Sequence, residues 1–397
     1  MPPPRPAVRP ITTGTDRMLS AEQRHSALID ALVAAGDLRD PALIDAFRAV
    51  PRHLFVPRRG AATAHGTALD ADTRPDHWLA SVYTDDAIVT QIDDGDPERP
   101  RGIPTSSCSA PTVVARMLEA AELRDGHRVL EIGTGTGWNA ALLAARLGDD
   151  RVVSVEIDPE VWARARKALR AAGRAPPAVL SDGAGGHPAG APYDRTIATC
   201  AAVRVPQAWI RQTAPGGLVV LPWTAAEGAG ALTRLRTAGD GSASGPFLCG
   251  LGFMPLRSQR PPPEAPTAPE EAVPDETRLL PEPDPVSPLT RFASAFPVTF
   301  MVPGWRMGLR HSPGIGGRSL WLASADGRSW ARVVPTGAGW RAEQAGPRSL
   351  WDEVEAARSR WTALGRPPLE RFGLTVEADG RHRVWLDAPD GPGWPQG

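Results

Sequence analysis

The sequence predicts an α/β protein built around a doubly wound, largely parallel sheet. Strand-like and helix-like segments alternate from residue 128 to residue 221, which is typical of parallel strands joined by crossover helices. A glycine-rich segment, GTGTG, separates the first of these strands from the first helix. Two strand-like runs joined by GDGSASG follow the last parallel strand, and they indicate an antiparallel hairpin at the sheet edge.

The hydrophobic pattern justifies each element in turn. We predict strands at 128–132, 151–155, 178–181, 194–199 and 217–221, helices at 137–147, 159–172 and 206–213, and a closing hairpin at 231–239 and 247–256. Upstream, apolar residues at helical spacing predict helices at 20–36, 41–50 and 112–123, and the run at 81–92 is β-prone.

Composition divides the chain into five parts. Ten prolines and many acids predict an extended spacer at 259–290, whereas eight of the thirteen tryptophans follow it and require a folded region. That last region has hairpin patterns at 319–334 and 373–387 and a capping-box pattern from Ser349 to Asp352. The parts are a disordered N-terminus (1–16), N-terminal helices with a substrate-side segment (17–104), the sheet domain (105–258), a Pro-rich acidic linker (259–290) and a C-terminal Trp-rich α+β module (291–397).

Charge and residue usage exclude several functions. With a formal net charge of −1, the chain has no global positive field for nucleic acid or an anionic membrane. The three cysteines form no CxxC pair, the eight histidines lack metal-ligand spacing, and no window approaches the roughly 18 apolar residues of a membrane span. We therefore expect a cytoplasmic protein without a metal site.

The glycine-rich turn predicts a ligand site. Gly133, Gly135 and Gly137 lie where a ligand can meet the backbone and a helix N-terminus. The spacing is GxGxG, and no GxxxxGK[ST] is present, which disfavours dinucleotides and triphosphates. Glu156, about 20 residues later, can accept hydrogen bonds from ribose hydroxyls, and Asp182 with Gly183 can meet an adenine edge. Together these features predict S-adenosylmethionine.

Several motifs agree with this prediction. They are PRHLFVP, VYTDDAI, SCSAPTVVARMLE, VLEIGTGTGWNAALLA, VSVEID, DGAGG, PYDRTIATCAAVRVPQAW and APGGLVVLP. In this order the sequence resembles protein-L-isoaspartate O-methyltransferases over about residues 20–257. The resemblance implies a Rossmann-like seven-stranded S-adenosylmethionine-dependent methyltransferase fold, here with an N-terminal helical lead-in and a separate C-terminal α+β module. It also implies a peptide-bound carboxylate as methyl acceptor.

The resemblance carries over onto particular residues. Ser109 takes the place of the active-site hydroxyl, although the residue could equally cap the helix that follows Pro111. The cofactor set is Glu131, Gly133, Thr134, Gly135, Gly137, Asn139, Glu156, Asp182 and Gly183. The substrate set is Tyr83, Asp85, Ile88, Ser107, Thr199, Cys200, Ala201 and Ala202. Two departures stand out, because Trp138 replaces a usual tyrosine and Cys200 enters a segment normally rich in Ala and Thr.

The chemistry of such a site needs little acid or base. A carboxylate with a pKa near 4 is already ionised at pH 7, so its attack on a sulfonium methyl needs no general base. The protein must chiefly align the reacting atoms and exclude water. We expect Ser109 to orient the acceptor carboxylate.

Three functions stay open at this point. The long segment 57–104 and the C-terminal region resemble extended actinobacterial members associated with lanthipeptides, lasso peptides and graspetides, whereas repair enzymes of the family are shorter. That resemblance implies methylation of an aspartate in a constrained peptide, with the ester closing to an aspartimide and the C-terminal module docking the precursor or shaping the acceptor groove. The alternatives are general repair of isoaspartyl proteins and a cofactor-binding protein without catalysis.

Overall fold

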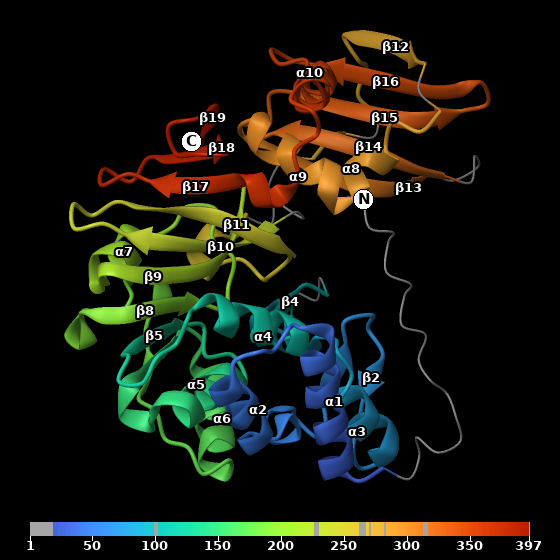
Figure 1. Cartoon of the computed structure of the whole chain (residues 1–397). Helices are drawn as coiled ribbons and strands as arrows, with labels where there is room; N and C mark the ends of the chain where they lie inside the picture. Colours follow the sequence, from blue (N-terminus) through green and yellow to red (C-terminus); the bar gives the residue numbers. More distant parts are fainter. Residues whose placement is uncertain are drawn as a thin grey trace. The chain divides into compact units, whose positions relative to one another are not determined.

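The chain forms two compact units in its computed structural model (Figure 1). The structure describes residues 19–98, 102–225, 230–261, 267–269, 271–281, 283–312 and 317–396. Unit 1 comprises Met1–Gly126 and Thr134–Leu180, and unit 2 comprises His127–Gly133 and Ser181–Gly397. Among the described residues, no helix combines the length and apolarity needed to cross a bilayer.

Unit 1 combines helices with a small antiparallel sheet and one βαβ element. Its helices are α1 (Ala21–Ala35), α2 (Pro41–Ala49), α3 (Pro75–Val82), α4 (Pro111–Ala120), α5 (Trp138–Leu147) and α6 (Pro159–Ala171). Its strands are β1 (Ala61–Thr63), β2 (Ala68–Leu69), β3 (Ile88–Ile92), β4 (Pro104–Cys108), β6 (Val152–Glu156) and β7 (Ala178–Leu180). The small sheet has the order β2-β1-β3-β4, and β6 pairs with β7 in parallel across α6.

The substrate-side segment is more structured than its sequence predicts. Only the second half of the β-prone run at 81–92 forms a strand, because the first residues complete α3. β3 and β4 then pair as an antiparallel hairpin that ends one residue before Ser109. The strand that leads to Ser109 is therefore held in a defined ladder with β3.

Unit 2 contains the remaining strands of the central sheet and all of the C-terminal region. Its helices are α7 (Gln207–Gln212), α8 (Ser287–Thr290), α9 (Phe292–Met301) and α10 (Leu350–Ala363). Its strands are β5 (Val129–Ile132), β8 (Tyr193–Ala198), β9 (Thr213–Thr224), β10 (Gly230–Thr237), β11 (Ala243–Leu251), β12 (Glu276–Leu280), β13 (Trp305–Ser312), β14 (Gly317–Ser324), β15 (Trp330–Thr336), β16 (Gly339–Ala345), β17 (Phe372–Val376), β18 (His382–Leu386) and β19 (Gly393–Gln396).

The main sheet of unit 2 confirms the predicted α/β class. β8 pairs in parallel with both β5 and β9, and β9, β10 and β11 then run antiparallel to one another. The parallel strands and the closing hairpin thus form where the alternating pattern predicts them. The hairpins predicted at 319–334 and 373–387 are also present, as β14–β15 and β17–β18.

The C-terminal region differs from the predicted separate module. β17 pairs antiparallel with β11, so β17, β18 and β19 continue the main sheet (Figure 1). A chain of ring contacts runs across this junction through Trp223, Phe247, Phe296, Phe300 and Phe372. Phe296 and Phe300 lie on α9, which therefore packs aromatic surface against rings from β9, β11 and β17. Burial of this apolar area gives the C-terminal strands and the main sheet a common core.

The predicted linker differs as well. Within 259–290, β12 pairs antiparallel with β16 and completes a five-stranded sheet of order β12-β16-β15-β14-β13, with α10 packed beside it (Figure 1). Arg332 donates hydrogen bonds to the carbonyl oxygens of Pro269 and Ala272, each at 3.0 Å. Proline keeps its carbonyl acceptor although it lacks an N–H donor, so a Pro-rich stretch can still be fastened by arginines.

The capping box predicted at Ser349 does not form. Ser349 is the N-cap residue of α10, but its side chain makes no capping hydrogen bond. Asp352 instead accepts hydrogen bonds from Arg278 at 2.9 Å and from Gln344 at 2.9 Å. The carboxylate that the pattern assigns to the cap is therefore used to join α10 to β12 and β16.

The β17–β18 hairpin also fastens the segment that leads into α7. His382 Nε2 accepts a hydrogen bond from the Val205 N–H at 2.8 Å, and His382 Nδ1 bonds the Gly380 carbonyl at 2.9 Å. Gln207 Nε2 donates to the Glu377 carbonyl at 2.7 Å. His382 must be neutral to accept the Val205 N–H. Burial lowers the pKa of His382 and, with a smaller contribution from the nearby Arg204 charge, favours that neutral form.

We expect His382 to make folding stability depend on pH. Because its pKa is lowered in the folded state, the neutral side chain stabilises the protein above the ordinary histidine pKa, and this contribution is lost as pH falls through the lowered value. His382→Gln keeps a donor and an acceptor but does not titrate. Urea unfolding should show wild type more stable than His382→Gln by about 1 kcal/mol at pH 8, with the difference shrinking below about pH 6.5. His77→Gln, at an exposed position, is the control. A difference that stays constant with pH would contradict the assignment.

Candidate active site

The glycine-rich turn in unit 1 exposes backbone at the start of α5. Gly137 is the N-cap of α5 and has a φ of 90°, in the left-handed region that favours glycine. A Cβ placed there would lie 3.3 Å from Leu169 Cγ, so α6 crowds this position too. The Thr134 hydroxyl bonds the Ser154 hydroxyl of β6 at 2.6 Å and fixes the beginning of the turn. The turn is therefore held in one conformation.

Glu156 ends β6 with its carboxylate fixed by three backbone donors. Oε2 accepts the Gly135 N–H at 2.9 Å, and Oε1 accepts the N–H groups of Ile157 at 3.0 Å and Asp158 at 3.1 Å. The residue is only 8% exposed. Desolvation by burial is the largest influence and raises the pKa of Glu156, while the three N–H donors oppose that shift.

This arrangement fits the ribose of S-adenosylmethionine. A carboxylate offers about four acceptor positions, and the three backbone donors leave Oε2 with capacity for a further donor. The donors also fix both oxygens in direction, so a ligand hydroxyl would meet a preorganised acceptor. Asp158 then caps α6 by accepting the N–H groups of Glu160 and Val161, each at 3.0 Å.

Unit 2 supplies the other predicted cofactor residues. Asp182 is exposed and accepts the Ala184 N–H at 2.9 Å. A Cβ on Gly183 would lie 2.6 Å from Ile132 Cγ2, so only glycine fits between this turn and β5. The Gly183 carbonyl accepts a bond from Trp209 Nε1 at 2.7 Å. Asp182 is thus exposed to solvent on a turn with a fixed backbone, so its carboxylate is accessible to a ligand.

Two further residues of the predicted cofactor set are buried. Glu131 lies in β5 and is fully buried, and Asn139 is buried in the first turn of α5. Gly133 accepts a short hydrogen bond from the Thr199 hydroxyl at its carbonyl. Trp138, the departure from the family pattern, is buried and donates from Nε1 to the Val50 carbonyl at 3.4 Å. The larger ring is therefore accommodated in the core of unit 1.

Ser109 follows β4 with a half-buried side chain. Among the residues that the structure describes, none forms a hydrogen bond with its hydroxyl, and α4 has Ala110 as its N-cap with no side-chain cap. Ser109 is thus not the helix cap. Ser107 also lies close to the cofactor turn, since its carbonyl oxygen would be 3.5 Å from a Cβ on Gly135. The end of β4 and the glycine turn are neighbours within unit 1, and the hydroxyl of Ser109 is available to a ligand.

Three predicted substrate residues in unit 1 make internal contacts instead. Asp85 caps α4 by accepting the Thr112 N–H at 2.8 Å and the Thr112 hydroxyl at 2.6 Å. The Tyr83 hydroxyl bonds His53 Nδ1 at 2.5 Å, and burial raises the pKa of Tyr83 to about 12. Ile88 is fully buried in β3. These three side chains are therefore held by contacts within unit 1.

The predicted substrate residues of unit 2 follow β8. The Thr199 N–H bonds the Ile132 carbonyl at 2.9 Å. The Ala201 and Ala202 N–H groups bond the carbonyls of Met254 at 2.8 Å and Pro222 at 3.0 Å. Cys200 is half-buried between these anchored residues. The segment therefore has a fixed backbone, in which Thr199 and Cys200 are partly exposed while Ala201 and Ala202 are buried.

Two residues of unit 1, Gln91 and Arg52, connect segments of the predicted site, although the sequence analysis did not single them out. Gln91 Nε2 donates to Asp158 Oδ2 at 3.2 Å, which links the β3–β4 hairpin to the turn that contains Glu156. Arg52 donates to the Ser109 carbonyl at 2.9 Å. Arg52 stands beside His53 in PRHLFVP, so the motif marked its position but not its contacts. No pattern in the sequence singles out Gln91.

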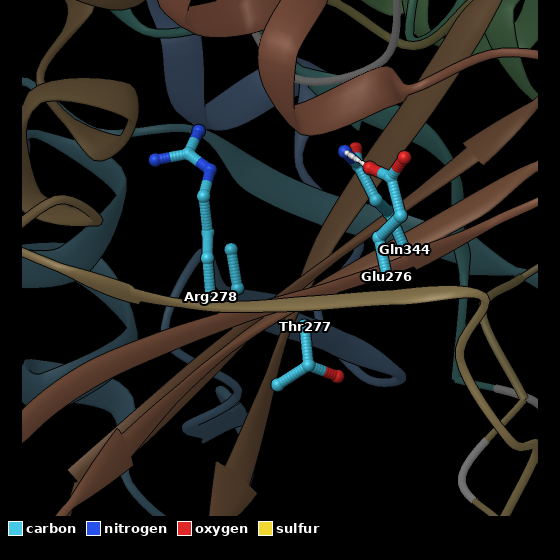
Figure 2. A pocket seen from close by; sticks show the side chains of 5 residues that line it. Glu276, Thr277, Arg278 and Gln344 are labelled. Atoms are coloured by element: carbon cyan, nitrogen blue, oxygen red, sulfur yellow. Dashed lines mark hydrogen bonds between the residues drawn. The ribbon is translucent and has the colours of Figure 1, made fainter.

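A cavity of about 330 Å³ lies away from these residues, on the five-stranded sheet of unit 2 (Figure 2). Figure 2 shows Glu276 and Arg278 from β12 with Gln344 from β16. The Arg278 guanidinium already pairs with two carboxylates of α10, those of Asp352 and Glu355. The cavity shares no residue with the predicted site. Within the described part of the chain, no cluster of three or more His, Cys, Asp or Glu residues is suited to a metal ion.

The fold and these residues define an α/β methyltransferase that depends on S-adenosylmethionine. The family model described as protein-L-isoaspartate(D-aspartate) O-methyltransferase (PCMT) matches residues 23–261. The chain therefore belongs to this family.

Relatives agree over nearly their whole length. The chain is 35% identical to a protein-L-isoaspartate O-methyltransferase of Ignicoccus hospitalis over 237 residues, which cover 59% of this chain and 98% of that protein. It is 38% identical to protein-L-isoaspartate O-methyltransferase 1 of an Anaeromyxobacter species over 233 residues, which cover 58% of this chain and 95% of that protein.

A solved structure named protein-L-isoaspartate O-methyltransferase shares the fold more widely. Its TM-score is 0.52 at 21% identity, and the match covers 92% of this chain and 100% of that one. A match that covers 92% of this chain must continue beyond residue 261, where the family model ends. The shared fold therefore extends into the C-terminal region.

We expect removal of the Glu156 charge to weaken cofactor binding. Glu156→Gln loses one charged acceptor, which corresponds to about 1.5–3 kcal/mol, or roughly 10- to 150-fold in Kd. Isothermal titration with S-adenosylhomocysteine measures this change. Glu160→Gln, two residues beyond the turn on the exposed side of α6, should leave Kd unchanged. Equal affinities for wild type and Glu156→Gln would remove Glu156 from the site.

Proposed function

We propose that this chain transfers a methyl group from S-adenosylmethionine to the free carboxylate of an isoaspartyl residue in a peptide or protein. The observation that carries the proposal is the match to enzymes of that name over 98% and 95% of their length. The fixed carboxylate of Glu156 and the available hydroxyl of Ser109 supply the two recognition groups that such a reaction needs. A cytoplasmic location is part of the proposal, since Cys108, Cys200 and Cys249 form no disulfide within the described part of the chain.

The residues of this chain act by binding and alignment. Glu156 would accept hydrogen bonds from the ribose hydroxyls of the nucleoside, with Asp182 and Gly183 at the adenine. When bound, S-adenosylmethionine supplies an electrophilic methyl group on a sulfonium, which departs as a neutral thioether. The acceptor carboxylate is ionised at neutral pH and provides the electron pair for the new O–C bond, so no proton is transferred in this step.

Ser109 has one donor, which suits a single carboxylate oxygen. Its hydroxyl would donate to one oxygen and leave the other free to attack. A single hydrogen bond of this kind orients the acceptor without neutralising its charge. Proximity and orientation account for much of the rate in such a reaction, because no bond to the protein forms.

The ester product then reacts without the enzyme. Methanol is a better leaving group than hydroxide, so the neighbouring backbone nitrogen attacks the ester carbonyl, loses its proton and expels methanol. The product is a five-membered aspartimide, which water opens to aspartate or isoaspartate.

The C-terminal strands shape the acceptor side in this proposal. The β17–β18 hairpin bonds Val205 and Gln207, which directly follow the predicted substrate residues Thr199–Ala202. Through these contacts the hairpin restrains the segment that would border the acceptor.

A second candidate is methylation of an ordinary aspartate in a constrained, ribosomally made peptide. Two observations favour it: the paired β3–β4 hairpin leading to Ser109 and the half-exposed thiol of Cys200 at the substrate segment. In this version a modified precursor peptide is the partner. A third candidate, a protein that binds the cofactor without catalysis, has no specific observation in its favour.

The test uses S-adenosylmethionine with a deuterated methyl group and three peptides of one composition. They are a linear isoaspartyl peptide, its linear aspartyl isomer and a side-chain-cyclised aspartyl peptide. Mass spectrometry should show the labelled ester, followed by methanol loss, on the isoaspartyl peptide. Ser109→Ala should lower kcat by about 10-fold or more, whereas Ser106→Ala, on the same strand with its hydroxyl bonded to Thr90, should not.

Each outcome selects one candidate. Label on the cyclised aspartyl peptide with none on the isoaspartyl peptide would replace the first proposal with the second. Cofactor binding without label on any peptide would contradict both catalytic proposals. An unchanged kcat for Ser109→Ala would remove Ser109 from the acceptor site.

A further inference from the structure

Arg52 is a fully buried arginine that bonds five backbone carbonyls at once. Nη1 donates to the carbonyl oxygens of Val82 at 2.5 Å and Thr84 at 3.1 Å. Nη2 donates to those of Asp86 at 2.7 Å, Cys108 at 3.1 Å and Ser109 at 2.9 Å. These carbonyls belong to two segments, the turn between α3 and β3 and the end of β4.

The charge of Arg52 is balanced by dipoles. Among the described residues, no carboxylate forms an ion pair with it. Its guanidinium carbon lies 5.3 Å from the ring centroid of Trp138, the first residue of α5 after the glycine turn. A buried guanidinium without a counter-ion is tolerated only where carbonyls and aromatic faces surround it. The two segments must therefore converge on Arg52 for unit 1 to fold as it does.

This convergence fixes the position of Ser109. The hydroxyl of Ser109 has no hydrogen-bond partner in the described part of the protein, so only its backbone determines where it lies. The carbonyls of Cys108 and Ser109 both bond the same Arg52 nitrogen. The guanidinium of Arg52 also contacts the ring of Trp138, which begins α5 directly after the cofactor turn.

We propose that Arg52 is a positioning residue for methyl transfer, which holds the Ser109 hydroxyl in register with the cofactor turn through Trp138. The proposal rests on the proposed function, in which Ser109 meets the acceptor. Arg52 touches neither acceptor nor cofactor; it acts through the backbone of Ser109. A displacement of about 1 Å at a reacting group can lower a rate by roughly 100-fold, so the backbone bonds bear directly on catalysis.

Arg52→Lys tests the proposal because it keeps the charge but supplies at most three donors for five carbonyls. We expect kcat to fall by about 10-fold, and no further than in Ser109→Ala, with the Kd for S-adenosylhomocysteine within about 2-fold of wild type. The double variant Arg52→Lys, Ser109→Ala should be little slower than Ser109→Ala alone, since both changes remove one function. Additive losses, or an unchanged kcat, would overturn the proposal.

A readout independent of activity separates this proposal from the proposed function. Arg52→Lys should speed amide hydrogen exchange in peptides covering 82–88 and 104–110 by about 10-fold or more. The matched control is Arg146→Lys, a largely buried arginine of unit 1 that bonds Asp125 and the Leu123 carbonyl. It should leave exchange in those two peptides unchanged. Unchanged exchange in Arg52→Lys would overturn the positioning role, whereas exchange as expected in a protein that methylates no peptide would overturn the proposed function alone.

Discussion

The buried carboxylate of Glu156 is the constraint on which the cofactor half of the site depends. An ionised carboxylate can be buried only where donors surround it, and here all three donors are backbone N–H groups. One comes from Gly135 and two come from the residues that begin the turn into α6. The strand-to-helix turns after β5 and β6 must therefore adopt the conformations that point these amides at one group. The same requirement leaves an oriented acceptor at the end of β6.

The acceptor half of the site is organised by a buried cation. Arg52 gathers the carbonyls of two segments, and Asp85 and Tyr83 complete this framework with bonds to Thr112 and His53. Most polar side chains near Ser109 are consequently occupied by structural contacts. Among the described residues, neither the Ser109 hydroxyl nor that of Ser107, two positions earlier, forms a hydrogen bond with the protein, which leaves both available to a ligand.

How much of this structure the sequence predicts depends on how far apart along the chain the interacting residues lie. Alternating patterns and glycine turns are local, so the helices and strands of the sheet domain and the cofactor turn are predictable. The pairings of β11 with β17 and of β12 with β16 join residues far apart in the chain, and neither composition nor periodicity reports them. Asp85 illustrates the same limit at the site, because its local motif predicts a substrate residue but does not report its long-range bonds to Thr112.

A crystal structure with S-adenosylhomocysteine would show whether the fixed carboxylate of Glu156 receives the nucleoside. We expect a ribose hydroxyl within hydrogen-bond distance of Glu156 Oε2, while the bonds from Gly135, Ile157 and Asp158 persist. A nucleoside bound elsewhere, or a Glu156 carboxylate that has left its three amides, would contradict this expectation.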